Sequence, residues 1–588
     1  MPAFARVRTL LATPKMPRVV AAITALLLLP SIFTGLQADD YLHWLRASGA
    51  VPYGSRFDVF DFCDGTKSTI DFLKAGGMAG WWVLPGFRLR FFRPLSSFTH
   101  FVDYNYWPGA PWLMHAENLV ITAALAALGA VLYRRLLATR WIAGLAALLY
   151  ALDPGHGISG WIASRNTVLA PAFGVGALIL HDRWRRDAWS PGAALGPLLF
   201  ALGLLSGEAA VATLGYVVAY ALCLDAARPR ARLLAVLPYV GVTAAWQVVY
   251  RVVGYGASGS GLYLDPGRQP LRFLAEAPLR AVALLVGQLA TPPADVLTVL
   301  PPAGKVALLV WGLFFLAAFG WLVGPLLARD RTARFFALGA ILALAPICAT
   351  FASNRLLLFV GIGAMGLLAQ LVGSVALGLE EAPAASASRA ARLRAWAGRF
   401  LVVPGVVLRL VLGPVLFVVV ALLLPILGHY VDAASVDVPR QRDLHGRTVV
   451  VVNAPDLVVA LYRFVLPVDG TADTLVVGRL LSLTPGPVRL VRTGPRVLTL
   501  RSDGDLLSAP TAGLVRDDVH RMTVGDTFDD VGLTVHVDAV AATGRAQAAT
   551  FELASALEDP RYYWVAWDNG RFVPFTPPAV GAEVLLGR

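Results

Sequence analysis

Cysteine and charge are both scarce in this sequence of 588 residues. Two of the three cysteines lie in apolar runs, so no disulfide framework is available, and no Cys-x-x-Cys pair or Cys/His cluster suggests a zinc site. Only 15% of the residues are charged, whereas 57% are hydrophobic and the mean hydropathy is +0.64. A soluble multidomain protein does not have this composition, so we expect a protein of the lipid bilayer.

The charge that is present does not follow the pattern of a nucleic-acid-binding protein. The net charge is +12, but the basic residues form short blocks between apolar runs rather than one phosphate-binding face. Such blocks are typical of the cytoplasmic loops of membrane proteins. We therefore expect no nucleic-acid partner.

Apolar runs recur from residue 19 to residue 428, and a membrane-spanning helix needs roughly 20 such residues. Placing the basic blocks on one side of the membrane fixes how the runs alternate, and predicts about eleven transmembrane helices. The expected helices are 19–36, 114–132, 141–153, 166–180, 193–206, 208–224, 233–253, 305–327, 335–351, 355–378 and 400–428.

The same rule places residues 1–18 in the cytoplasm and the C-terminus on the outer side of the membrane. Basic residues before the first run resemble the start of a signal peptide. We expect the run to be retained as an anchor, because the acids that follow it are useful only when they are tethered to the membrane.

Three regions depart from the helical pattern of the transmembrane domain, 19–428. Residues 37–113 form a long first outer loop. Within 279–303, the segment 281–300 is apolar enough to cross the membrane, but a crossing there would put a later basic loop on the outer side. We therefore expect a re-entrant or surface helix broken at Pro292–Pro293. Residues 430–588 alternate short Val-, Leu- and Thr-rich runs with turn residues, which predicts an extracytoplasmic β-rich domain with a hairpin turning at 568–570.

Two adjacent acids, Asp39 and Asp40, follow directly on the first apolar run in "LQADDYLHWLR". Like charges this close disfavour each other, which raises one pKa toward a value that suits a general base. The alternative, that the pair only ends the helix and faces water, stays open.

Other polar residues gather at the same predicted membrane face. They come from "RLRFFRPLSSFTHFVDYNYW", "WLMHAENLVIT", "LDPGHGISGWIASRN", "LLSGEAAV" and "TFASNRLLLF". Polar groups at membrane depth are costly and usually face a cavity, and an arginine there can bond a phosphate bidentately. The candidate donor-phosphate and substrate-binding residues are Arg93, His100, Asp103, His115, Asn118, His156, Arg165, Glu208 and Arg355.

Each of these residues also has a purely structural interpretation. His115 alone is typical of a satisfied histidine at a helix end. Asp58, Asp61 and Asp64, spaced at i, i+3 and i+6, favour a solvated face over a calcium site. The prediction therefore depends on the residues converging on one face rather than on any one of them.

Five segments, taken in order along the chain, resemble the motif series of the GT-C superfamily of polyprenyl-phosphate-dependent membrane glycosyltransferases. They are "ADDY", "FRPLSSFTHFVDY", "HAEN", "DPGHGISGWIASRN" and "LSGE". The similarity is greatest to the bacterial relatives of the transmembrane, tetratricopeptide-bearing O-mannosyltransferases. The similarity covers residues 20–225, and a weaker similarity is found at "SNRLLLFVGIG". The family's segments read as an Arg-Pro-Leu loop, a His-x-x-Asn helix, "HPxHVEAVxWxxxR" and "LSKE".

The resemblance implies a glycosyltransferase in the bacterial inner membrane. It implies a lipid-linked sugar phosphate as donor and a protein, lipid or glycan as extracytoplasmic acceptor. Asp40, or its neighbour Asp39, would act as general base, and Arg93, Arg165 and Arg355 would hold the leaving phosphate. No cofactor is certain, and a divalent metal is left open because branches of the family differ.

Four residues depart from the family pattern, and two other functions stay open. Asp153 and Ile158 replace the first His and the Glu of the "HPxHVEAV" segment, Gly207 replaces the lysine of "LSKE", and Thr122 replaces a second histidine. The tetratricopeptide tail is replaced by the β-rich domain. One alternative is a non-catalytic scaffold or glycan-binding envelope protein of the same fold. The other is a transporter, which would require internal repeats and polar residues near the midplane.

Overall fold

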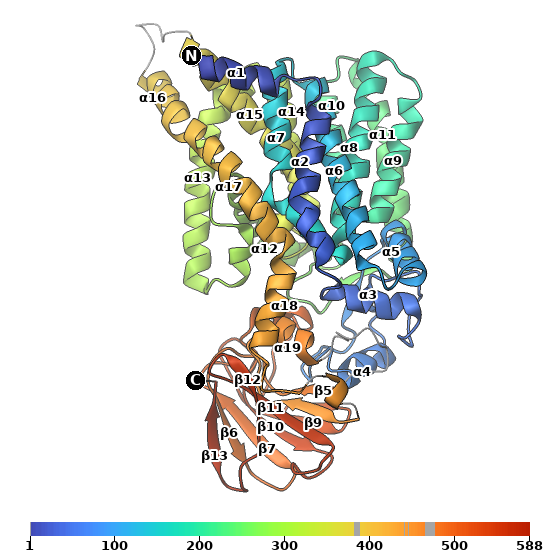
Figure 1. Ribbon diagram of the computed structural model, residues 1–588, viewed down its shortest axis with the longest axis vertical. Helices are drawn as coiled ribbons and strands as arrows, with labels where there is room; N and C mark the ends of the chain where they lie inside the picture. The colour runs from blue at the N-terminus through green and yellow to red at the C-terminus, as the bar shows by residue number, and fades with distance from the viewer. Residues whose placement is uncertain (1, 381–388, 440, 445, 465–476, 588) are drawn as a thin grey trace. The chain divides into compact units, whose positions relative to one another are not determined.

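The structure is a computed structural model that describes residues 2–587 except 381–388, 440, 445 and 465–476 (Figure 1). The chain divides into two compact units, each assembled from three segments. The helical unit contains Met1–Leu36, Phe91–Gly254 and Pro266–Leu423, and the strand-rich unit contains Gln37–Arg90, Tyr255–Asp265 and Leu424–Arg588.

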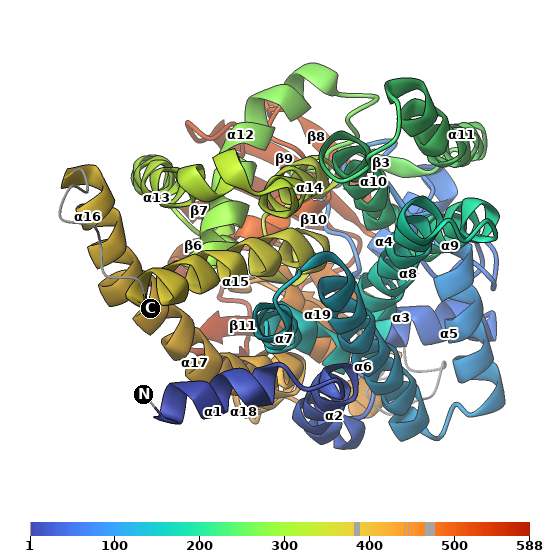
Figure 2. The ribbon, with the colours of Figure 1, turned by 90° about the horizontal axis from the view of Figure 1, so that it is seen from above.

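The helical unit is a bundle whose helices are seen end-on in Figure 2. Its α-helices are α1 (Pro2–Leu11), α2 (Met16–Leu28), α5 (Pro94–Tyr106), α6 (Pro111–Leu136), α7 (Arg140–Ala151), α8 (Arg165–Asp187), α9 (Gly192–Ser206), α10 (Ala212–Cys223), α11 (Pro229–Val252), α12 (Pro270–Leu289), α13 (Pro302–Arg329), α14 (Arg331–Ile347), α15 (Leu358–Glu380), α16 (Arg389–Ala397) and α17 (Val403–Ala421). Short helical turns between them are η1 (Leu29–Phe33), η2 (Pro154–Gly160), η3 (Ile162–Ser164), η4 (Glu208–Val211), η5 (Ala294–Thr298), η6 (Asn354–Leu356) and η7 (Gly398–Val402).

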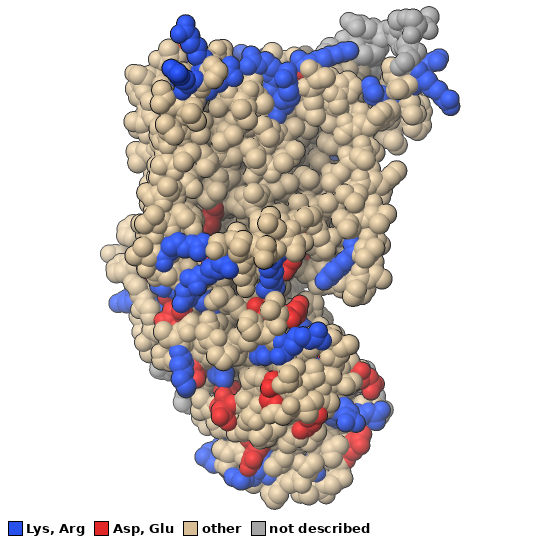
Figure 3. Space-filling model, turned by 180° about the vertical axis from the view of Figure 1, so that it is seen from behind, with Lys and Arg blue, Asp and Glu red and all other residues tan. Residues whose placement is uncertain are grey.

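The ends of these helices follow from the local sequence. Proline occupies the first turn of α6, α11 and α13, where its missing N–H costs nothing. Arginines occupy the last turn of α6, α8 and α13 and complement the negative end of the helix dipole. Lys and Arg side chains gather at one end of the bundle, and a broad band without charge follows along its side (Figure 3).

Within the described residues, seven helices are long and apolar enough to cross a membrane. They are Met16–Phe33, Pro111–Leu136, Ile162–Asp187, Pro229–Val252, Pro302–Arg329, Leu358–Ala376 and Arg389–Ala421. The predicted multi-pass helical fold with a C-terminal β-rich region is therefore confirmed.

All eleven expected segments are helical, but four of them are shorter in the described residues than a full membrane crossing. Three of the expected helices are the shorter apolar segments Arg140–Ala151, Gly192–Ser206 and Glu208–Cys223, and α14 has 17 residues. The expected surface segment begins within α12, which ends at Leu289 ahead of Pro292–Pro293, and continues through η5. Hydropathy locates these segments, but it does not measure the length of helix that forms.

The strand-rich unit combines three sheets with a few helices. Its helical segments are α3 (Asp39–Ser48), α4 (Lys67–Ala75), α18 (Leu423–Ala433), η8 (Gln441–Leu444), α19 (Leu457–Phe464) and η10 (Pro510–Leu514). Its strands are β1 (Asp61–Cys63), β2 (Arg88–Arg90), β3 (Gly256–Ser258), β4 (Thr448–Val451), β5 (Val477–Leu480), β6 (Val488–Arg492), β7 (Val497–Ser502), β8 (Thr527–Asp530), β9 (Leu533–Val540), β10 (Ala546–Leu553), β11 (Tyr562–Asp568), β12 (Arg571–Pro574) and β13 (Glu583–Leu586).

The strand orders are β1-β2-β3, β13-β6-β7-β10-β9-β8 and β12-β11-β4-β5. The largest sheet is antiparallel throughout, whereas β4 pairs parallel with both β5 and β11. The predicted hairpin is confirmed, because β11 pairs antiparallel with β12 across Asn569 and Gly570, both at positive φ.

Candidate functional site

The helical unit contains nine of the predicted site residues, and the strand-rich unit contains Asp39 and Asp40. In the helical unit they lie on α5, α6, α8 and the short turns η2, η4 and η6. Six of the nine side chains are buried: His100, Asp103, His115, Asn118, His156 and Arg165.

Arg165, the first residue of α8, is the centre of the largest group of contacts. Its Nη2 lies 2.6 Å from Oδ2 of Asp103, and its Nη1 lies 2.9 Å from Oε2 of Glu117. Its Nε donates to Oδ1 of Asn118 over 2.7 Å. Burial raises the pKa of Asp103, against the lowering effect of the Arg165 charge. His100 completes the group, with its Nδ1 4.0 Å from Oδ2 of Asp103.

This arrangement limits what Arg165 can do. Arg165 and Asp103 are both fully buried, whereas the Glu117 side chain is 39% exposed. A guanidinium that already bonds two carboxylates and an amide has little capacity left for a phosphate. The contacts therefore favour Arg165 as the residue that fixes Asp103 and Glu117, which differs from its predicted role as a phosphate ligand.

A second ion pair joins two other predicted residues. Arg93, which directly precedes α5, places its Nε 2.8 Å from Oε2 of Glu208 at the start of η4. The pair is partly exposed, at 18% for Arg93 and 24% for Glu208. Ser96 supports the same junction by donating its hydroxyl to the carbonyl of Ser206. The Arg-Pro-Leu and "LSGE" segments are thus held together.

Two predicted residues on α6 bond backbone carbonyls. Nε2 of His115 lies 2.9 Å from the carbonyl oxygen of Gly35, and Asn118 donates its amide to the carbonyls of Ser159 and Trp161. His115 therefore fixes the end of the first apolar segment to α6, and Asn118 fixes the turn between η2 and η3. These contacts agree with the structural interpretation of His115 as a satisfied histidine.

Arg355 differs from the other predicted arginines. Within the part of the chain that the structure describes, it forms no ion pair with a carboxylate. Its guanidinium lies against the rings of Phe351 and Trp161, at 5.2 Å and 5.8 Å from their centroids. The segment that carries it is in contact with η2, where His156 packs edge-on against Tyr150. Arg355 is thus a cation that retains capacity for an anion.

Asp39 and Asp40 begin α3 in the strand-rich unit. Acids in the first turn of a helix interact favourably with its dipole, and Oδ2 of Asp40 accepts from the backbone N–H of Gln37 over 2.8 Å. Asp40 is fully buried. Ala38 just before them has φ 44°, a strained value for a residue other than glycine. The catalytic role of the two acids stays a prediction.

Four residues with strong contacts in the helical unit are not among the predicted site residues. Glu117 bonds Arg165. Asp153, one of the departures from the family pattern, pairs with Arg409 and accepts from Gln288. The signal for Arg409 was available, because a lone arginine in an apolar run indicates a function.

Gly207, another departure, sits in an extended backbone that any residue adopts. A Cβ there would lie 3.5 Å from its nearest neighbours, Cβ of Ala170 and the carbonyl of Asn166. The position therefore accommodates a side chain without displacement, and the missing lysine is not excluded by the fold.

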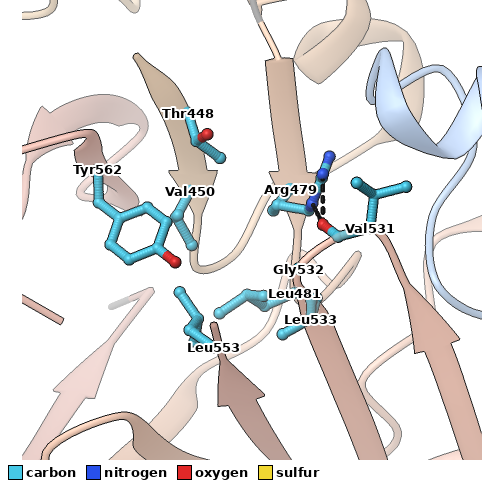
Figure 4. A pocket seen from close by; sticks show the side chains of 9 residues that line it. All are labelled: Thr448, Val450, Arg479, Leu481, Val531, Gly532, Leu533, Leu553 and Tyr562. Atoms are coloured by element: carbon cyan, nitrogen blue, oxygen red, sulfur yellow. Dashed lines mark hydrogen bonds between the residues drawn. The ribbon is translucent and has the colours of Figure 1, made fainter. Parts of the chain in front are cut away.

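A cavity of about 230 Å³ lies in the strand-rich unit (Figure 4). Thr448 and Tyr562 lie on one side of it, and Arg479 and Val531 on the other. Arg479 donates to the carbonyls of Val531, Lys74, Ala75 and Gly478, so its charge is already bonded. This lining is not typical of a catalytic site.

In the described residues no group of three or more His, Cys, Asp or Glu side chains is arranged to hold a metal ion.

Comparison with known proteins gives structural neighbours but no sequence match. No protein-family model matches the chain, and no curated protein matches it. Its structural neighbours include ArnT from Cupriavidus metallidurans bound to undecaprenyl phosphate, with 14% identity, a TM-score of 0.36, and coverage of 76% of this chain and 84% of ArnT. The archaeal oligosaccharyltransferase AglB from Archaeoglobus fulgidus, in complex with an inhibitory peptide and a dolichol-phosphate, is another. Its identity is 12% and its TM-score 0.38, over 79% of this chain and 64% of AglB.

Proposed function

We propose that this protein is a membrane glycosyltransferase that moves a sugar from a polyprenyl-phosphate donor to an acceptor hydroxyl. One observation supports the proposal. Segments far apart in the sequence, chosen because their order resembles the GT-C pattern, contact one another in the helical unit. Arg93 bonds Glu208, Arg165 bonds Asp103 and Asn118, and Arg355 stacks on Trp161.

The proposed roles follow from which charges are already paired. Arg355 has no carboxylate partner among the described residues, so we assign it to the donor phosphate, where negative charge develops as the sugar leaves. We assign Arg93, whose pair with Glu208 is partly exposed, as a second phosphate ligand. Arg165 instead orients Asp103 and Glu117. His100, His115, Asn118 and His156 support these residues by packing and backbone contacts.

In the proposed reaction, the acceptor oxygen bonds the anomeric carbon while the bond from that carbon to the phosphate oxygen breaks. The configuration of the sugar inverts, and the polyprenyl phosphate leaves with the electron pair. A carboxylate takes the proton of the acceptor hydroxyl. Asp40, with Asp39 as its alternative, is the proposed base because of its order in the motif series. Glu117 is a competing base, since its carboxylate is partly exposed. A divalent metal stays open, and no step here is routed through one.

The proposal places the protein in the bacterial inner membrane. Residues 1–18 would be cytoplasmic, and 430–588 would be extracytoplasmic. The donor's isoprenoid chain would remain in the bilayer, and the acceptor would be a protein, lipid or glycan reached from outside the cytoplasm.

The proposal is tested with purified protein in lipid nanodiscs and a panel of polyprenyl-phosphate sugars. Mass spectrometry follows donor consumption and transfer, with membrane extracts as the source of acceptors. We expect turnover in the wild type and a loss of at least about a hundredfold in Asp40→Asn or Asp39→Asn, the range for removing a general base. Glu117→Gln measured in parallel decides between the competing carboxylates.

Two outcomes would favour the alternative functions. Donor binding without turnover in every extract would favour the non-catalytic scaffold. Movement of an intact lipid-linked sugar across a sealed bilayer, with no sugar released from the lipid, would favour the transporter.

A further inference from the structure

α17 carries a single charged residue, Arg409, within a long apolar run. Its Nη2 lies 2.9 Å from Oδ2 of Asp153, which follows α7. Arg409 lies well inside Arg389–Ala421, a stretch long and apolar enough to cross a membrane. Charged residues within such stretches are rare and usually functional.

The pair connects three segments of the helical unit. Oδ2 of Asp153 also accepts from Nε2 of Gln288 near the end of α12, over 2.8 Å. Arg409 in turn donates from Nη1 to the carbonyl of Gln288 over 2.6 Å. The other oxygen of Asp153, Oδ1, accepts from the N–H of Gly155 at the start of η2. One carboxylate thus joins η2, α12 and α17.

The same segments hold the turn that carries Arg355. A Cβ on Gly155 would lie 2.8 Å from the carbonyl oxygen of Asn354, so η2 and η6 are in close contact. Oδ1 of Asn354 accepts from the N–H of Ala294, and the N–H of Asn354 donates to Asp295, both in η5 after α12. The backbone just before Arg355 therefore depends on where η2 and η5 are placed.

Stability alone does not account for charges at this position. A buried ion pair is often no more stabilising than apolar side chains of the same volume. The pair does, however, fix the relative positions of three segments with directional bonds, which apolar contacts do not.

We propose that Asp153 and Arg409 are a positioning pair that holds Arg355 in place to bind the phosphate of a lipid-linked donor. This inference rests on the proposed function, and it gives the Asp153 departure from the family pattern a role. Neither residue is taken to touch the phosphate itself. Their effect on binding is expected to pass through Arg355.

A double-mutant cycle tests this dependence. The dissociation constant of undecaprenyl phosphate is measured in nanodiscs for wild type, Asp153→Asn, Arg355→Ala and the double variant. Asparagine keeps one oxygen to accept from Gly155, but it loses the charge and the oxygen that accepts from Gln288 and Arg409. We expect Asp153→Asn to weaken binding about tenfold to a hundredfold, as small misplacements do. The double variant should bind no more weakly than Arg355→Ala. Additive losses would overturn the proposal.

Hydrogen exchange supplies a readout that does not depend on the ligand. We expect Asp153→Asn and Arg409→Gln to speed amide exchange in peptides covering 287–298 and 353–357. Asp225→Asn is the matched control, because Asp225 is a similarly buried partner of Arg185 outside these segments, and it should leave those peptides unchanged. Unchanged exchange in the Asp153 and Arg409 variants would overturn the proposal.

If a single variant fails to fold, Asp153→Asn with Arg409→Gln removes both charges together and carries the same expectations. Failure of the wild type to bind any polyprenyl phosphate would contradict the proposed function. The exchange experiment would still decide whether the ion pair positions the Arg355 turn.

Discussion

Arg165 and Arg93 form carboxylate pairs of similar geometry in opposite environments. Arg165 and Asp103 are fully buried, whereas Arg93 and Glu208 remain partly exposed. Removing one partner of a buried pair leaves an uncompensated charge that water cannot reach. Removing one partner of a partly exposed pair costs less, since water can reach the other. The energetic importance of each pair therefore depends on burial rather than on distance.

We expect Arg165→Gln to destabilise the protein by about 3–5 kcal/mol, because Asp103 loses its partner. Arg93→Gln is the matched control and should cost no more than about 1 kcal/mol. The apparent Tm of each variant in one detergent gives the comparison. A second control, Arg165→Gln with Asp103→Asn, should recover part of the loss. Equal Tm values for the two single variants would contradict the prediction.

The expected solvated face is wrong for Asp61, which is a buried acid in the strand-rich unit. Its Oδ2 lies 3.0 Å from Nε of Arg90, and its side chain is 2% exposed. Burial raises the pKa of Asp61 from 3.8 to about 6, against the lowering effect of Arg90 and Arg46 and with smaller contributions from Asp58 and Asp64. Between pH 4 and 6 the folded state therefore binds more protons at Asp61 than the unfolded state does.

Stability should consequently fall as the pH rises from about 4 to about 6, and this group should have no further effect above that range. A shift of about two units corresponds to about 3 kcal/mol. Asp61→Asn keeps an acceptor for Arg90 but does not titrate, so its stability should lack this slope. Denaturant unfolding of the strand-rich unit between pH 4 and 7.5 gives the free energy of unfolding of the wild type and of Asp61→Asn at each pH. Parallel curves would show that Asp61 keeps an ordinary pKa.

At the scale of elements, α17 packs along η2 through small residues. A Cβ on Gly157 would lie 2.4 Å from the carbonyl oxygen of Phe417, and one on Gly160 would lie 2.5 Å from that of Ala421. Gly413 on α17 makes a similar approach to the carbonyl of Leu152. Backbone atoms cannot move aside as a flexible side chain can, so these contacts fix the spacing between helix and turn.

Gly157→Ala should therefore separate α17 from η2 at a cost of about 1–3 kcal/mol, the range for overpacking. Gly405→Ala is the control on the same helix, because a Cβ there meets nothing within 4 Å in the described structure. Its apparent Tm should stay unchanged or rise slightly, since alanine is the better helix former. If both variants melted at the same temperature, the close packing of α17 on η2 would not matter for stability.

Hydropathy predicted these elements better than it predicted their contacts. The apolar runs located the spanning helices, because each must satisfy its own backbone in lipid. Hydropathy gave no information on how far each helix extends, and it did not predict that α7 and α9 are shorter than a full crossing. Motif order singled out Arg93 and Glu208 separately, but only the folded bundle brings their side chains to 2.8 Å. Asp153 and Arg409 are 256 residues apart, and no periodic pattern reports such a pair.

At the scale of the whole molecule, the strand-rich unit is interrupted twice by helical segments. Part of its core comes from the first loop. Trp81 and Trp82 are buried, and their indole N–H groups donate to the carbonyls of Leu481 and Ala512. The ring of Trp81 also packs against Phe528 and Phe551. The sequence composition marked 430–588 as β-rich, but composition does not reveal that residues 78–90 fill the same core.

Residues 424–588 expressed alone should therefore not fold stably, because losing each buried tryptophan costs about 3–5 kcal/mol and a domain is stable by only about 5–15 kcal/mol.

A chimera of 37–90, 255–265 and 424–588 should fold. Arg90 and Gly256 are direct partners in the β2–β3 pair, so a short Asn-Gly turn can close the first junction, and a flexible Gly/Ser linker can close the second. Near-UV circular dichroism and cooperative unfolding provide the measurement. The chimera with Trp81→Ala and Trp82→Ala should behave like 424–588 alone. A cooperatively folded 424–588 fragment would mean that the first loop is dispensable for this core.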